Sequence, residues 1–206
     1  MYSILNKIYK GFYMIVKFYN PETHQIVTHD ELCVLYNASI PSTVEQFDTF
    51  YKLVYGKRPI CDRFQYSKEN NPVLIDDKWT ITYTVLDRDV EDCRRDMLSE
   101  LNEKFEEKTK TAYLESSLGF PIDANDTANT NVEGLIKVMK NQGIESQYFC
   151  DYKNEYHLVT LPDLEIMQIE IIINAQSLYA RKWGFRDKIY AATTTEELRE
   201  IDINFD

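Results

Sequence analysis

The feature that most constrains this chain is a long helical pattern near its carboxyl end, from Leu161 to Ala192. At about 100° per residue, the apolar residues of this helix fall on two stripes roughly half a turn apart. The first stripe contains Leu164, Met167, Ile171, Ala175 and Leu178, and the second contains Ile166, Ile169 and Ile173. A helix on the surface of a domain needs only one apolar stripe. The second stripe therefore predicts either a helix enclosed on both sides by its own domain or a helix that contacts another protein chain.

The composition indicates a globular chain with an acidic surface. A chain of 206 residues can form one or two domains with a real hydrophobic core. Its 15 Tyr and 10 Phe supply large rings that suit half-exposed surfaces and interfaces. The net charge of −11 opposes binding to a phosphate backbone, which requires clustered Lys and Arg. We therefore expect no nucleic-acid partner.

The cysteines and the amino terminus predict synthesis in a reducing cytoplasm. The cysteines lie far apart and form no C-x-x-C pair, which indicates reduced and mostly buried thiols. They are Cys33, Cys61, Cys93 and Cys150. The segment Met1 to Phe18 is apolar, but lysines interrupt it before the apolar core of a signal peptide develops, and no small-residue cleavage site follows. We expect neither a signal peptide nor a membrane span.

Residues 1–86 read as a small α+β module. Alternating and β-branched residues predict two hairpins, and a capping pattern before an apolar run predicts one helix. The expected elements are a hairpin of Tyr13–Tyr19 and Gln25–Thr28, a strand at Cys33–Ala38, a helix that starts at Ser42 or Thr43 and stops at Gly56, and a second hairpin within Pro72–Leu86.

Residues 87–115 predict a charged connecting helix with a narrow apolar seam. The seam contains Val90, Cys93, Met97, Leu101 and Phe105, with Asp87 or Asp89 as the N-cap. Such a seam packs on its own domain or takes part in self-association or a coiled-coil contact, and the pattern leaves both open. The candidate partner-interface residues are therefore Met97, Leu101 and Phe105 of this helix and Ile166, Ile169 and Ile173 of the long helix.

Residues 116–206 predict a second module, which makes the fold class α+β. The expected elements are a polar loop at Ile122–Thr130, a helix at Val132–Lys140 capped by Asn131 and ended by Gly143, a hairpin of Gln147–Tyr152 and Tyr156–Leu161, the long helix, and a short terminal helix with Thr194 and Glu197 in a capping box. The carboxyl-terminal module thus contains a β-hairpin and a long helix.

Residue patterns that mark chemistry are incomplete in this chain. Asp123 and Asn125 begin like a calcium loop, but Ala128 and Gly134 stand where an EF-hand needs Gly and Glu. None of the histidines, His24, His29 and His157, has a partner at a zinc-site spacing. Cys150 and His157 could converge across their hairpin, but no oxyanion-binding element lies beside the thiol. We expect no catalytic residue, no metal and no cofactor, and hence no enzyme.

From about Arg94 onward, the chain resembles an uncharacterised domain family that many tailed bacteriophages encode in or beside tail-fibre genes. The motifs that carry this resemblance are Ser117–Ala124, Asn131–Leu135, the strand end Tyr156–Leu161, and the pattern Lys182-Trp183-x-x-Arg186-Asp187-x-Ile189-Tyr190-Ala191-Ala192-Thr193-x-x-Glu196-x-Leu198-x-x-Ile201-Asp202-Ile203. The segment from Asn71 to Val85, followed by an acidic helix, looks like the front module of phage tail-fibre assembly proteins. The aromatic stretch Met1–Tyr13 departs from that pattern.

The resemblance implies a non-enzymatic role in building a phage tail. The expected function is a structural tail protein that docks tail fibres or another tail component. The alternative is a tail-fibre assembly chaperone that the mature virion does not retain. The implied partners are phage tail or tail-fibre proteins, with a homo-oligomer left open, and the implied location is the virion tail after synthesis in the host cytoplasm. An acidic, aromatic-rich chain with a surplus apolar stripe agrees with such protein–protein docking.

Overall fold

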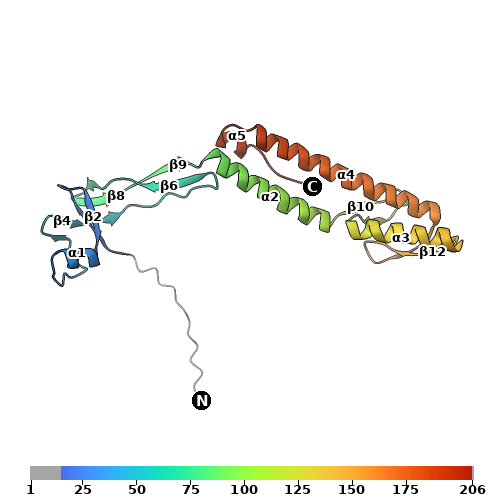
Figure 1. Cartoon of the computed structure of the whole chain (residues 1–206), viewed down its shortest axis with the longest axis horizontal. Coiled ribbons are helices and arrows are strands. Elements are labelled where there is room, and N and C mark those ends of the chain that lie inside the picture. The colour runs from blue at the N-terminus through green and yellow to red at the C-terminus, as the bar shows by residue number, and fades with distance from the viewer. Residues whose placement is uncertain (1–14, 206) are drawn as a thin grey trace, which may run out of the picture. The chain divides into compact units, whose positions relative to one another are not determined.

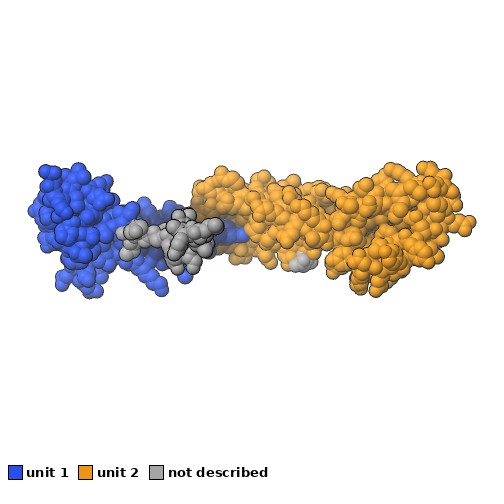
Figure 2. All heavy atoms as spheres, turned by 90° about the horizontal axis from the view of Figure 1, so that it is seen from below, with its two compact units in different colours: residues 1–87 blue, residues 88–206 orange. Residues whose placement is uncertain are grey.

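The computed structural model describes residues 15–205, and their contacts divide the chain into two compact units (Figure 2). Unit 1 is Met1–Asp87 and unit 2 is Arg88–Asp206. Helices and several small sheets occur together, which confirms the α+β fold class. Among the described residues, no helix combines the length and apolar character that crossing a bilayer would require.

A four-stranded antiparallel sheet with the order β2-β1-β4-β3 and one short helix form the first part of unit 1. The elements are β1 (Lys17–Asn20), β2 (Gln25–Thr28), α1 (His29–Leu35), β3 (Gln46–Phe47) and β4 (Phe50–Lys52). Phe18, Leu32 and Phe50 are buried together between the sheet and α1. The β1–β2 pairing confirms the first predicted hairpin, although Tyr13 and Met14, at the start of that prediction, lie outside the described residues.

Two short elements of unit 1 differ from the sequence prediction. The strand expected at Cys33–Ala38 is wrong because a helix begins earlier, at His29, where Thr28 and Glu31 form a capping box. Asn37 then reverses the chain with a φ of 44°. The helix expected from Ser42 to Gly56 is also wrong. Phe50 is buried on the sheet and Asp48 makes a left-handed turn, so tertiary pairing overrides the local helical pattern.

The rest of unit 1 contains a three-stranded sheet, β5-β8-β7, and a two-stranded ribbon, β6-β9. The strands are β5 (Val54–Tyr55), β6 (Gln65–Glu69), β7 (Val73–Ile75), β8 (Lys78–Ile81) and β9 (Tyr83–Asp87). The β7–β8 pairing around Asp76 and Asp77 confirms the second predicted hairpin. The strand β6 was not predicted because its sequence is almost wholly polar.

One long helix, α4 (Leu161–Ala191), is the axis of unit 2 (Figure 1). Its 31 residues span roughly 46 Å. The helix α2 (Val90–Lys110) runs antiparallel along the carboxyl-terminal half of α4, and α3 (Asp126–Gln142) runs antiparallel along the amino-terminal half. Two helices in succession thus pack along one long helix.

The core of unit 2 lies between these helices. It contains Cys93, Met97, Leu101 and Phe105 of α2, Val132, Ile136 and Met139 of α3, and Leu164, Met167, Ile171, Leu178 and Ile189 of α4. The short helix α5 (Thr195–Arg199) adds Leu198, and the following segment adds Ile203 and Phe205. Arg94 of α2 donates hydrogen bonds to the carbonyls of Ile189 and Ala192, which satisfies the carboxyl end of α4.

The helix boundaries in unit 2 correct several predictions. The predicted connecting helix ends at Lys110 instead of Glu115, because Tyr113–Glu115 forms β10, which pairs with β11 (Pro121–Asp123). Asp89 is its N-cap, and the helix packs inside unit 2. The helix α3 begins at Asp126, capped by Asn125, so most of the predicted polar loop is helical. Gly143 ends α3 with a φ of 65°, as predicted.

The carboxyl-terminal hairpin and helices agree closely with the prediction. The strands β12 (Ser146–Cys150) and β13 (Tyr156–Thr160) pair in antiparallel fashion, and β13 leads directly into α4. Thr194 caps α5 by accepting a hydrogen bond from the backbone N–H of Glu197, but the Glu197 carboxylate accepts hydrogen bonds from Thr193 instead of Thr194, so only half of the predicted capping box is present. The expectation of mostly buried thiols is wrong, because only Cys93 of the four free cysteines is buried and Cys150 is exposed.

Candidate functional site

The second apolar stripe of α4 lies on the surface of unit 2. Ile166, Ile169 and Ile173 are 39%, 58% and 63% exposed, whereas Leu164 and Met167 of the first stripe are fully buried. The two stripes are therefore separated by their environment as well as by their position on the helix. A row of exposed β-branched side chains on one helix face is typical of a docking surface. These three isoleucines remain candidate interface residues.

The candidate interface residues of α2 are not available to a partner. Met97 and Leu101 are each 1% exposed and Phe105 is 6% exposed, because all three face α4 and the carboxyl-terminal segment. Phe105 packs against the rings of Tyr179 and Phe205, at centroid distances of 4.9 and 5.8 Å. The narrow seam thus packs on its own unit, and the prediction of a partner interface on α2 is corrected.

The structure adds exposed apolar residues that the sequence analysis missed. On α4, Trp183 and Tyr190 are 48% and 60% exposed and extend the second stripe toward the carboxyl end, whereas Ile172, which is 45% exposed, lies beside the stripe near the start of α3. The seven-residue spacing between Trp183 and Tyr190 was the available signal. On the outer face of the β12–β13 hairpin lies a separate aromatic patch, which contains Tyr148, Tyr156 and Leu158.

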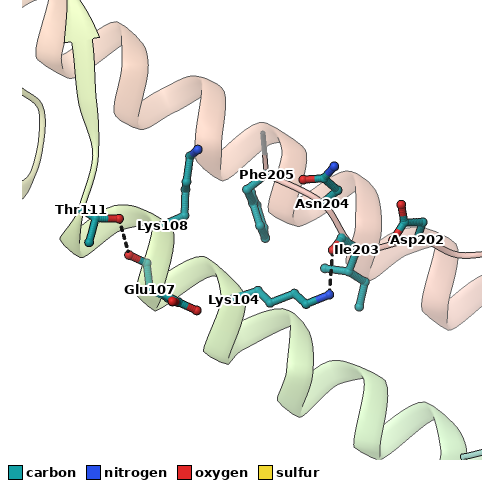
Figure 3. Close-up of a pocket in the computed structure, with 8 residues that line it drawn as sticks. All are labelled: Lys104, Glu107, Lys108, Thr111, Asp202, Ile203, Asn204 and Phe205. Atoms are coloured by element: carbon teal, nitrogen blue, oxygen red, sulfur yellow. Dashed lines mark hydrogen bonds between the residues drawn. The ribbon is translucent and has the colours of Figure 1, made fainter. Parts of the chain in front are cut away.

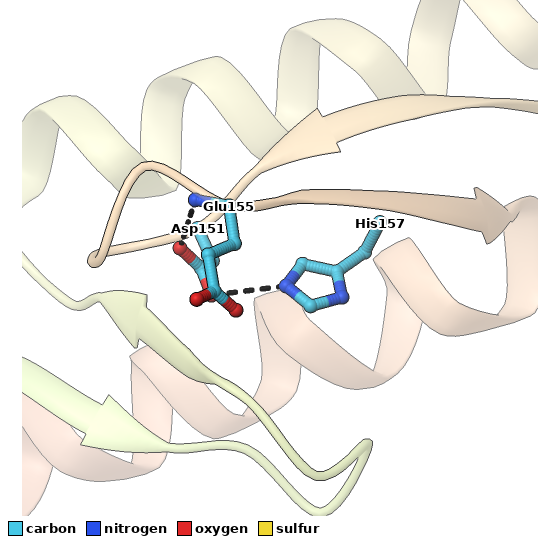
Figure 4. A group of neighbouring side chains, drawn as sticks. All are labelled: Asp151, Glu155 and His157. Atoms are coloured by element: carbon cyan, nitrogen blue, oxygen red, sulfur yellow. Dashed lines mark hydrogen bonds and ion pairs between the residues drawn. The ribbon is translucent and has the colours of Figure 1, made fainter.

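An acidic and imidazole cluster lies where the β12–β13 hairpin turns (Figure 4). Asp151 is buried and accepts hydrogen bonds from the backbone N–H groups of Lys153 and Glu155, both at 2.8 Å, and from His157 Nε2 at 2.9 Å. Burial by itself raises the pKa of Asp151, but these hydrogen bonds from Glu155, His157 and Lys153 bring the pKa below its ordinary value. Asp151 is therefore a carboxylate that closes the hairpin turn.

The side chains of this cluster are of the types that bind metal ions, but two of them are already in contact with other groups of the protein. Asp151, Glu155 and His157 offer ligand atoms within 4.8 Å of one another. Both carboxylate oxygens of Asp151 already accept hydrogen bonds from the protein, and the His157 ring stacks on Phe120 at a centroid distance of 3.9 Å. A metal ion bound by His157 Nε2 would have to break the hydrogen bond from this atom to Asp151. The geometry favours a role in holding the hairpin against the β10–β11 connection.

Cys150 and His157 do not form a nucleophile–base pair. His157 is the register partner of Phe149, and Cys150 is the partner of Tyr156, so the thiol and the imidazole lie on opposite faces of the hairpin. Their convergence, which the sequence left open, is excluded by this register. The segment that begins like a calcium loop at Asp123 does not form such a loop. Ala128 and Gly134, which stand where an EF-hand needs Gly and Glu, both lie within α3.

The turn between β10 and β11 is attached to the middle of α4 by one carboxylate. Glu170 accepts hydrogen bonds from the hydroxyl of Ser116 at 2.6 Å and from the backbone N–H of Ser117 at 2.9 Å. Burial opposes ionisation of Glu170, but the hydrogen bonds from Ser116 and Ser117 lower its pKa. Gly119 completes the turn with a φ of 91°. The contact fixes the point at which the chain passes from α2 to α3 along α4.

A polar groove of about 530 Å³ lies between α2 and the carboxyl-terminal segment (Figure 3). Lys104 donates a hydrogen bond across it to the carbonyl of Ile203, and Arg181 donates to the carbonyls of Asn204 and Phe205. Glu107 lines the same groove, and its backbone carbonyl accepts a hydrogen bond from the hydroxyl of Thr111. These contacts hold the carboxyl-terminal segment of the chain in place.

Residues 92–204 match the model of a protein family described as a domain of unknown function (DUF4376). The match covers more than half of the chain. The chain belongs to this family. No curated protein and no solved structure matches it.

The DUF4376 segment falls within unit 2. The exposed stripe of α4, the Asp151 cluster and the Glu170 contact are all parts of the family domain. Unit 1 lies outside the matched residues. Of these candidates, Asp151 and His157 bond each other and Glu170 bonds the β10–β11 turn, whereas the α4 stripe has no covering element among the described residues.

Proposed function

We propose that this chain is a structural bacteriophage tail protein that docks tail fibres or another tail component through protein–protein contacts. The observation that carries the proposal is the exposed apolar stripe of α4 at Ile166, Ile169 and Ile173. Water in contact with three isoleucine side chains on one rigid helix face is unfavourable, and a docked partner removes this cost. The docking role is non-catalytic.

Three further features support the proposal. The motifs between Ser117 and Ile203 resemble a domain family of tailed phages. The outer face of the β12–β13 hairpin carries exposed Tyr148, Tyr156 and Leu158, and aromatic residues of this kind are enriched in protein interfaces. The net charge of −11 suits a partner with a basic surface. Together these features favour assembly over chemistry.

The first test is the protein composition of purified phage particles that encode this chain. A structural tail protein is expected in finished particles at a fixed ratio to the other tail proteins. A chaperone would be abundant in the infected lysate and missing from the particles. The second result would replace the structural role with the alternative function, and absence of the chain from both tail intermediates and particles would overturn the proposal.

The second test replaces Ile169 and Ile173 together with Asp. The double variant is expected to keep its far-ultraviolet circular dichroism and its cooperative unfolding but to be lost from tail intermediates and particles. The matched control is Val138→Asp, which changes an apolar residue of α3 that is 43% exposed. Wild-type incorporation of the double variant, or its complete unfolding, would contradict docking through this stripe.

A further inference from the structure

The exposed side of α4 carries a heptad seam. Residues that alternate in steps of three and four occupy the two seam positions of a coiled coil, usually labelled a and d. Along α4 these residues are Ile166, Ile169, Ile173, Gln176, Ala180, Trp183, Asp187 and Tyr190. At least a third of each isoleucine side chain is exposed, and Trp183 and Tyr190 are about half exposed. The seam is thus a continuous surface feature of the helix.

The other large apolar side chains on the opposite side of α4 are already buried against the rest of unit 2. Met167, Ile171, Leu178 and Ile189 lie on the opposite side and pack against α2 and α3. The helix therefore has two apolar sides, of which its own unit covers one. A helix with an uncovered heptad seam packs most readily against another helix with the same repeat.

We propose that a second copy of this chain covers the seam, with the two α4 helices antiparallel about a two-fold axis. The second copy is then the tail component that the stripe docks, so this proposal rests on the docking role proposed for the stripe and names its partner. In this arrangement Ile173 packs against Gln176 of the second copy, Ile169 against Ala180, and Ile166 against Trp183. Each contact occurs twice, because a two-fold interface repeats every pair. The overlap from Glu165 to Arg186 is roughly 33 Å of helix.

The charges that flank the seam favour the antiparallel orientation. Glu165 and Arg186 hold the same flanking heptad position at opposite ends of the overlap. Antiparallel pairing places Glu165 of each copy beside Arg186 of the other, which gives two attractive pairs. Parallel pairing would place Glu165 beside Glu170 and would bring Asp187 against itself inside the seam. Antiparallel pairing also leaves Asp187 at the edge of the overlap, where it stays solvated.

Glu165 and Arg186 each have an ion-pair partner within their own chain, and these pairs are weak enough for both side chains to pair with a second copy as well. Glu165 forms an exposed ion pair with Lys140 at 2.7 Å, and Arg186 forms one with Asp187 at 3.0 Å. Exposed pairs of this type contribute little to stability, so sharing them with a second copy costs little. Gln176 lies near the centre of the overlap, and a single polar residue in a seam sets the register between helices.

The mass of the full chain in solution tests self-association directly. Size-exclusion chromatography with light scattering is expected to give the mass of two copies, and Ile169→Asp with Ile173→Asp is expected to give the mass of one. The control Val138→Asp is expected to stay dimeric. A wild-type chain that is monomeric at high micromolar concentration, a mass of three copies, or a dimer that survives the double substitution would each overturn the proposal.

A charge exchange tests the orientation. Glu165→Arg alone and Arg186→Glu alone each turn two attractive pairs into repulsive ones and are expected to weaken the dimer roughly tenfold. The chain with both substitutions is expected to dimerise as tightly as the wild type, because the exchanged charges face each other again. Failure of the double exchange to restore the dimer would overturn the antiparallel arrangement.

The two proposals fail in distinguishable ways. A monomeric chain whose Ile169→Asp and Ile173→Asp variant is also lost from phage particles would refute self-pairing and keep the docking function. A dimer that depends on these isoleucines but has no role in particles would refute the docking function and keep self-pairing. If only a variant lacking residues 1–14 dimerises, the chain's own amino-terminal segment covers the seam and the proposal is overturned.

Discussion

The two apolar sides of α4 are similar in composition and opposite in environment. Leu164 and Ile171 on one side are 0% and 2% exposed, while Ile169 and Ile173 on the other are 58% and 63% exposed. The difference arises because α2 and α3 are both placed along the first side. Periodicity thus reveals that a helix has two apolar faces, but the remaining elements of the unit decide which face becomes core and which becomes surface.

The strongest test of this comparison is a cavity on the buried side. Leu164→Ala is expected to lower the free energy of unfolding of unit 2 by about 2–5 kcal/mol, because it removes buried methyl groups and leaves a void between α3 and α4. Urea denaturation followed by circular dichroism measures the change. A loss below about 1 kcal/mol would mean that this side is not the core in solution.

A smaller effect is expected at the boundary between the two sides, where Glu170 attaches the β10–β11 turn to α4. Glu170→Ala leaves the buried Ser116 hydroxyl without its carboxylate and is expected to cost about 1–3 kcal/mol. Urea denaturation at pH 7, at a concentration where the chain is monomeric, measures this cost, and Glu165→Ala, on the exposed flank of the same helix, is the matched control.

The same carboxylate predicts a dependence on pH. The pKa of Glu170 is lower in the folded state than its ordinary value of 4.5, so its contribution is present above pH 4.5 and is lost as the pH falls through the folded pKa. The stability of the wild type is therefore expected to fall more steeply below pH 4.5 than that of Glu170→Gln. Identical slopes for the two proteins would contradict this assignment.

A substitution at the start of α4 measures how much the capping hydrogen bonds stabilise this helix compared with its core packing. The carboxylate of Asp163 accepts hydrogen bonds from the backbone N–H and the hydroxyl of Thr160, at 2.8 and 2.7 Å. Asp163→Ala is expected to cost about 1 kcal/mol in chemical denaturation, well below the cost at Leu164. A larger loss than that of Leu164→Ala would show that capping outweighs core packing in this helix.

The smallest effect is expected on the exposed side. At a concentration where the chain is monomeric, Ile173→Ser is expected to change the free energy of unfolding by no more than about 0.5 kcal/mol, because the side chain already contacts water. Thermal and urea unfolding measure the change. A cost equal to that of Leu164→Ala would remove the distinction between the two sides, and with it the basis for docking through this face.

Long and strongly periodic segments were predicted well from the residues alone. The long helix, expected at Leu161–Ala192, is observed at Leu161–Ala191, and the hairpin before it has the expected strands. Many turns of a regular pattern outweigh any single tertiary contact. In unit 1 the opposite holds. The segment around Cys33 was expected as a strand and is a helix, because one capping box and the burial of Leu32 decide so short an element.

The candidate site was predictable only in part. The exposed isoleucines were identified from their period, but Met97, Leu101 and Phe105 had the same apolar pattern and proved to be core. The pattern of one helix does not reveal which other helix covers it. The contact between Asp151 and His157 was also missed, since it depends on the strand register that brings residues six positions apart to one face of a hairpin turn.

The order of the residues alone was enough to predict an α+β protein with a long helix that carries apolar residues on two sides. This was possible because hydrophobic period and capping chemistry act over a few neighbouring residues. The packing of distant segments places α2 and α3 both on the first side and leaves Ile166, Ile169 and Ile173 in contact with solvent. Burial is a property of distant segments brought together, and no local pattern specifies that choice.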